Sequence, residues 1–67
     1  MYASVNFKTK KAFKEAVKRG DRITLFAPGL GIPAVNGNDV VEGPHYPAPH
    51  TWYAQVTMRD GIVVSVR

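Results

Sequence analysis

The side chains best suited to catalysis or ligand binding fall within the twelve residues from Gly43 to Ala54. This segment holds both histidines, the only tryptophan, two of the three tyrosines and three of the five prolines. Each proline fixes its own φ and pushes the residue before it into an extended conformation, so the segment is stiff. A stiff loop that carries imidazoles and aromatic rings favours contact with a ligand or a neighbouring subunit. The alternative is that the rings only close the end of a small core.

The two histidines, His45 and His50, are the side chains that titrate near neutral pH, so they are the first candidates for catalysis. No serine lies in a nucleophile-elbow motif, and the histidines lie in a proline-rich loop without the helical face of a zinc-binding HExxH motif. The chain has no cysteine, which excludes a thiolate zinc site and a disulfide. We therefore predict no enzyme activity, no metal and no cofactor. A metal shared between subunits through both histidines is the weaker alternative.

Binding fits these residue types better than catalysis does. Imidazoles donate hydrogen bonds to phosphates or base edges, arginine forks hold phosphate, and tyrosine rings stack on bases. The nine Lys and Arg against five Asp and Glu give a formal charge of +4, which favours a phosphate-bearing partner. The four lysines of residues 10–18 are most simply a solvated helix face, and contact with phosphate is the second interpretation.

The whole chain predicts a single α+β domain of residues 1–67, in which one amphipathic helix packs on an antiparallel sheet of four to five strands. Thr9 suits the N-cap and Gly20 the C′ position of a helix that ends near Arg19. The apolar stripe of this helix is Ala12, Phe13, Ala16 and Val17. Strands are expected at residues 2–7, 22–27, 39–42, 52–58 and 62–67. The glycine-rich residues 28–38 form a loop that lacks the Gly-Lys-Ser/Thr of a phosphate-binding P-loop.

The last two strands have a predicted register. A three-residue loop over residues 59–61, with Gly61 in the left-handed conformation, puts the apolar side chains of both strands on one face. The pairs are Met58 with Ile62, Val56 with Val64, and Ala54 with Val66. This register places Trp52 in the core and Tyr53 on the opposite face.

Chain length and hydropathy limit the oligomeric states and the cellular locations that are expected for this protein. A cysteine-free chain of 67 residues buries a marginal core, so we expect a homo-oligomer, either a dimer or a tetramer. No apolar run approaches the roughly 20 residues of a membrane span, so no membrane contact is expected. Residues 1–11 lack the apolar core of a signal peptide, so the protein is expected to remain in the cytosol.

Several motifs together resemble a family of very small phage-encoded proteins. They are the lysine-rich helix with Lys-Glu-Ala-Val, Phe-x-Pro-Gly, Val-Glu-Gly-Pro-His-Tyr-Pro-x-Pro-His-x-Trp-Tyr-Ala, and Asp-Gly-Ile-Val-Val. The likeness covers nearly the whole chain, and the long central run is its most specific part. The family is similar to the anti-CBASS sponges, phage counter-defence proteins that sequester the cyclic-nucleotide signals of bacterial immunity.

This resemblance implies an oligomer in the host bacterial cytoplasm that encloses a cyclic dinucleotide between subunits without cleaving it. It implies ligand contacts at His45, Tyr46, His50 and Tyr53, with Phe26 nearby. Two other classes stay open: a binder of single-stranded nucleic acid or of a host protein, and a structural phage accessory protein. Nucleic acid is the less favoured partner.

Overall fold

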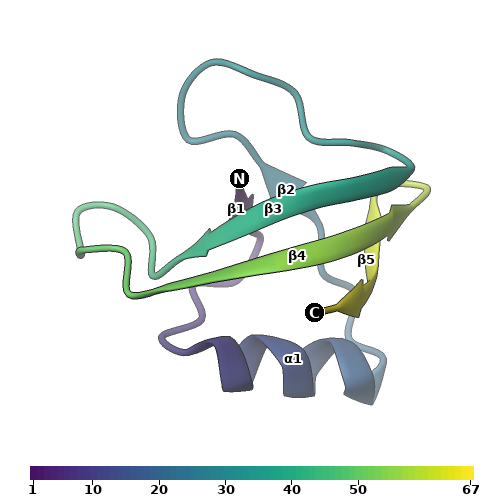
Figure 1. Ribbon diagram of the computed structural model, residues 1–67, viewed down its shortest axis with the longest axis horizontal. Coiled ribbons are helices and arrows are strands. Elements are labelled where there is room, and N and C mark those ends of the chain that lie inside the picture. The colour runs from purple at the N-terminus through teal and green to yellow at the C-terminus, as the bar shows by residue number, and fades with distance from the viewer.

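The computed structural model describes residues 1–67 and has a small α+β fold with one helix and five strands. The elements follow in the order β1 (Tyr2–Ala3), α1 (Lys10–Arg19), β2 (Leu25–Phe26), β3 (Gly37–Gly43), β4 (Trp52–Arg59) and β5 (Ile62–Val66). The predicted fold class is confirmed, but the strands form two antiparallel sheets, β1–β2 and β3–β4–β5, where one was predicted. Figure 1 shows α1 along one side of the larger sheet, with β1 and β2 behind β3.

Isolated backbone hydrogen bonds join the two sheets at both sides. At one side, the amino group of Met1 donates to Val40 O at 3.1 Å, and the N–H of Glu42 donates to Met1 O at 2.9 Å. At the other side, the N–H of Val63 donates to Ile23 O at 2.9 Å. The strands therefore surround one core, although β1 and β2 are much shorter than the predicted strands at residues 2–7 and 22–27.

The helix begins and ends where the sequence predicts. The N–H of Ala12 donates to Thr9 Oγ1 at 3.1 Å, and Gly20 adopts a left-handed φ of 91° that lets its N–H reach the last turn. Phe13 and Ala16 are buried and Val17 is half-buried, whereas Ala12 is exposed and does not belong to the predicted stripe. The core therefore depends on a narrow helix face, and its members are Ala3, Phe13, Ala16, Ile23, Val41, Trp52, Ala54, Val56, Met58 and Val63.

An ion pair follows the helix at its C-terminal end. Arg19 pairs with Asp21, and no ion pair forms within the helix between Lys11 and Glu15 or between Glu15 and Arg19. The hydrogen bond from Arg19 lowers the pKa of the Asp21 carboxyl. Because this pKa is lower in the folded state, the pair stabilises the fold above the ordinary pKa of aspartate and loses that effect as the pH falls through the lowered value. Both side chains are exposed to solvent, so the effect is small.

The predicted register of β4 and β5 is wrong, and the turn explains why. Asp60 and Gly61 both have positive φ, 51° and 77°, and form a two-residue turn that pairs Arg59 with Ile62. A bulge in β5 then adds one residue, so Met58 pairs with Val63 and Val56 with Val66. The turn itself places Val63 in the core opposite Met58, and the bulge leaves Val64 exposed and pairs Val66 with Val56. Val63 and Val64 therefore have the reverse of their predicted positions.

The placement of Trp52 and Tyr53 survives this correction, because it depends only on the alternation along β4. Trp52 is 8% exposed and Tyr53 is 59% exposed, on opposite faces of the strand. The core side of β4 also carries Ala54, Val56 and Met58.

Candidate functional site

The loop of residues 44–51 connects β3 to β4 (Figure 1), and hydrogen bonds from its backbone N–H groups fix it in place. The N–H of Thr51 donates to Gly43 O at 2.7 Å and closes the loop at its base. The N–H of Ala48 donates to His45 O at 3.1 Å and closes a turn inside it. The N–H of His45 donates to Asn6 Oδ1 at 2.9 Å, which ties the loop to the segment before α1. These bonds give the loop a defined position, as its prolines predict.

Tyr2 is the centre around which the predicted site residues gather. The His45 ring stacks on the Tyr2 ring with centroids 4.6 Å apart and an angle of 11° between the planes. The Phe26 ring meets both rings edge-on, at 5.7 Å from Tyr2 and 5.5 Å from His45. His45 Nε2 lies 2.9 Å from Ala3 O, so this nitrogen donates its proton to the carbonyl. His45 and Phe26 therefore pack the loop against β1 and β2.

The hydroxyl of Tyr2 joins the second histidine to the same cluster. The N–H of Tyr46 donates to this hydroxyl at 2.9 Å, and His50 Nε2 lies 2.7 Å from it. The Tyr2 oxygen therefore has two hydrogen-bond partners in the loop, the backbone of Tyr46 and the ring of His50. Nδ1 lies 3.6 Å from Glu42 Oε2, which gives a chain of polar groups from Glu42 through His50 to Tyr2.

This chain of groups holds the loop but offers no accessible nucleophile. Tyr2 is 5% exposed, and its oxygen already receives the Tyr46 N–H and meets His50. A substrate would have to displace these contacts to reach the oxygen, so the arrangement is that of a structural clamp. Sequence reasoning missed Tyr2 because it lies more than 40 positions from the loop in the chain.

Replacing Tyr2 by phenylalanine lowers the free energy of unfolding by about 1–2 kcal/mol, because the Tyr46 N–H and His50 Nε2 lose their partner while the ring packing is kept. Urea unfolding followed by circular dichroism measures the change. Tyr53→Phe, which removes an exposed hydroxyl, is the matched control and stays within about 0.5 kcal/mol of the original protein. Equal unfolding midpoints for the two variants would contradict the clamp.

The two remaining site residues point outward. Tyr46 is 81% exposed and Tyr53 is 59% exposed, and neither hydroxyl makes a hydrogen bond within the chain. Tyr53 pairs with Glu42 across β3 and β4, so its ring lies on the outer face of the sheet, the face on which Glu42 reaches His50. The structure thus gathers His45, His50 and Phe26 into the clamp and leaves Tyr46 and Tyr53 free for contact with another molecule.

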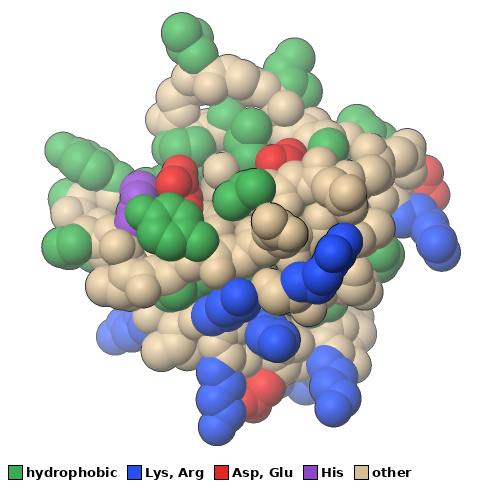
Figure 2. All heavy atoms as spheres, in the orientation of Figure 1, with side chains coloured by type: hydrophobic (Ala, Val, Ile, Leu, Met, Phe, Trp, Pro, Cys, Tyr) green, Lys and Arg blue, Asp and Glu red, His purple; other side chains and the backbone are tan.

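Charge is distributed unevenly around this site. Figure 2 shows the histidine side chains at one end of the larger sheet, beside acidic and hydrophobic side chains. In that view the Lys and Arg side chains gather mainly over α1 and the far end of the sheet. The loop end is therefore aromatic and the helix side is basic.

Comparison with protein-family models, curated proteins and solved structures finds no match to this chain. The function of the site is therefore inferred from its geometry. No three His, Cys, Asp or Glu side chains lie close enough together to hold a metal ion. None of the helical structure is long and apolar enough to cross a membrane.

Proposed function

We propose that this protein is a phage counter-defence sponge, a homo-oligomer that binds and sequesters a cyclic dinucleotide in the host bacterial cytoplasm without cleaving it. The observation that carries the proposal is the pair of exposed rings, Tyr46 and Tyr53, which are held on a fixed loop and on a strand. The motif resemblance from Gly43 to Ala54 supports the ligand class, and the clamp accounts for the histidines without a catalytic role.

Stacking is the chemistry that these rings offer. A base stacked on an aromatic side chain contributes about 1–3 kcal/mol to binding, and a ring that is already fixed loses little entropy when the base arrives. Tyr46 is anchored through its backbone N–H to Tyr2, and Tyr53 lies within the paired part of β4. Two fixed rings match a ligand that has two bases.

Exposed apolar side chains support an oligomer. Leu30 and Ile32 are fully exposed in the loop between β2 and β3, and Val40 is half-exposed on the outer face of β3. Figure 2 shows hydrophobic side chains projecting at the side of the molecule where this loop lies. A second copy that covers such side chains would add buried apolar area, which a single core of this size needs. Such an assembly would be a dimer or a tetramer.

Replacing Tyr46 or Tyr53 by alanine weakens binding of the cyclic dinucleotide about 10-fold, since each change removes one stacking surface. Both rings are exposed, so the free energy of unfolding changes by no more than about 0.5 kcal/mol. Isothermal titration calorimetry measures the affinity, and Tyr53→Phe separates the ring from the hydroxyl. If the alanine variants bind as tightly as the original protein, the two tyrosines do not contact the ligand.

The fate of the ligand separates a sponge from an enzyme. Protein is incubated with the cyclic dinucleotide and then heat-denatured, and the released nucleotide is analysed by chromatography. Intact cyclic dinucleotide is the expected product. A linear or monomeric product would show that the protein is an enzyme.

The lysines of α1 favour single-stranded nucleic acid as a second candidate. Lys10, Lys11, Lys14 and Lys18 are all on this helix, and all but the half-buried Lys10 are exposed. A polymer that contacts several lysines releases many counterions, so its affinity falls steeply with salt, whereas a small ligand shows a shallow slope. Titrations at several salt concentrations distinguish the two candidates.

A further inference from the structure

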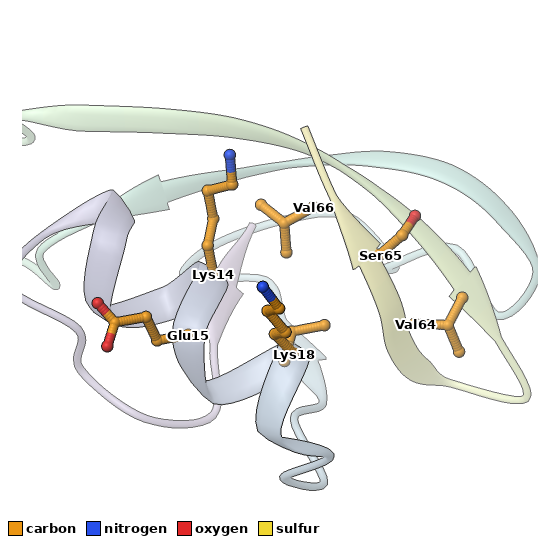
Figure 3. Close-up of a pocket in the computed structure, with 7 residues that line it drawn as sticks. Lys14, Glu15, Lys18, Val64, Ser65 and Val66 are labelled. Carbon is orange, nitrogen blue, oxygen red and sulfur yellow. The ribbon is translucent and has the colours of Figure 1, made fainter.

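A groove separates α1 from β5, on the helix side of the molecule. Its volume is about 450 Å³, within the usual range of about 300–1,000 Å³ for binding clefts. Val17 of the helix and Val64 and Val66 of the strand give it apolar walls. Figure 3 shows the Val66 side chain in the gap between strand and helix. The groove belongs to neither the clamp nor the exposed tyrosines.

The edge of β5 that borders this groove has free backbone groups. The N–H of Arg67 donates to Gln55 O at 2.7 Å, so Arg67 faces β4. Backbone groups alternate in direction along an antiparallel strand, so the N–H and C=O of Val66 point away from β4. The hydrogen bond from Val63 to Ile23 is the last backbone hydrogen bond that β5 makes along this edge. Beyond it, the N–H and C=O of Val66 are open to another strand.

The groove is also positively charged. Lys14 and Lys18 both line it, and Figure 3 shows them rising from the helix on the side that faces β5. Glu15 also lines the groove, but Figure 3 shows its carboxylate on the side of the helix away from β5. An occupant of this groove therefore meets a free strand edge on one side and two ammonium groups on the other.

We propose that β5 pairs with an extended acidic segment of a partner protein, which adds a strand to the sheet at residues 64–66. Main-chain hydrogen bonds provide affinity in this mode of recognition, and alternate side chains provide specificity. Because side chains alternate along a strand, every second residue of the segment faces α1. The groove selects Glu or Asp at those positions, opposite Lys14 and Lys18.

A second copy of this chain does not suit the groove. Its acidic strand segment, Asp39 to Glu42, is already paired with β4 on one edge and bonded to Met1 on the other. Pairing of two β5 edges would bring Lys14 and Lys18 of each copy toward the same lysines of the other, and like charges repel. The charge of the groove therefore selects a different, acidic partner.

The test is a ¹⁵N–¹H NMR titration with the peptide acetyl-Val-Glu-Val-Glu-Val-Glu-amide. We expect shifts at the amides of residues 64–66 and slower hydrogen exchange at Val66. The double variant Lys14→Gln/Lys18→Gln weakens binding roughly 5-fold, as loss of two exposed ion pairs does. The variant Lys8→Gln/Lys11→Gln loses the same charge outside the groove and changes the affinity less than about 2-fold.

Three outcomes would overturn the proposal. They are no shift at residues 64–66 at millimolar peptide, equal shifts with a peptide that has lysine in place of glutamate, and shifts there with a cyclic dinucleotide alone. The proposed function is tested separately, because its tyrosines lie outside the groove and Tyr53→Ala leaves the peptide affinity unchanged.

Discussion

Replacing Trp52 by alanine lowers the free energy of unfolding by about 3–5 kcal/mol, a large part of the total stability of a domain of this size. The indole is 8% exposed, and its ring lies 5.4 Å from that of Phe13, so it connects β4 to the buried face of α1. Its Nε1–H donates to Phe7 O at 3.1 Å, which fixes the segment before the helix. Alanine leaves a cavity and an unpaired carbonyl at the same point.

Thermal and urea unfolding, followed by circular dichroism, measure this loss. Tyr53→Ala is the matched control, since it removes a neighbouring aromatic ring from the exposed face of the same strand. If Trp52→Ala stayed folded and lost ligand binding while Tyr53→Ala unfolded, this account would be contradicted. Trp52 would then lie on the ligand-binding face of β4, and Tyr53 would lie in the core.

Replacing Gly43 by alanine costs about 2–3 kcal/mol, because the added methyl group overlaps the Trp52 indole. Gly43 pairs with Trp52 across β3 and β4, and the indole covers the position that a side chain would occupy. The ring cannot move aside, because Phe13 and the Phe7 carbonyl hold it. The glycine of the Gly-Pro-His-Tyr motif therefore makes room for the tryptophan of the same motif.

The control for this substitution is Gly29→Ala. An added methyl group at Gly29 meets no atom within 4 Å, so this variant unfolds at nearly the same urea concentration as the original protein. A Gly43→Ala variant with the same midpoint as Gly29→Ala would show that the indole has room to shift, and the packing of Trp52 on Gly43 would lose its structural importance.

The parts of the fold that depend on local signals were predicted from the sequence. Thr9 and Gly20 bound the helix through contacts within a few residues, and the alternation along β4 separates Trp52 from Tyr53. The pairing of β5 was not predicted, because the extra residue at Val64 restores the core-facing alternation after a two-residue turn. Periodicity alone favoured a longer turn, which puts Ile62, Val64 and Val66 on the core face without a bulge.

The candidate site was predicted only in part, for a similar reason. The loop of residues 44–51 and its residue types were evident from composition. The central residue of the site, Tyr2, was not evident from the sequence. The pairing of β1 with β2 and the contact of Met1 with β3 bring Tyr2 to this loop from the other end of the chain. Without Tyr2, His45 and His50 suggest ligand donors, whereas in the fold Nε2 of each histidine already has a hydrogen-bond partner.

Native mass spectrometry of the protein with a panel of cyclic dinucleotides tests the proposed function most directly. It reports the number of subunits and the number of bound ligands in the same spectrum. We predict a dimer or tetramer that retains one of the cyclic dinucleotides at a fixed stoichiometry, with the ligand mass unchanged. A monomer that binds none of the panel at micromolar concentration would contradict the proposal.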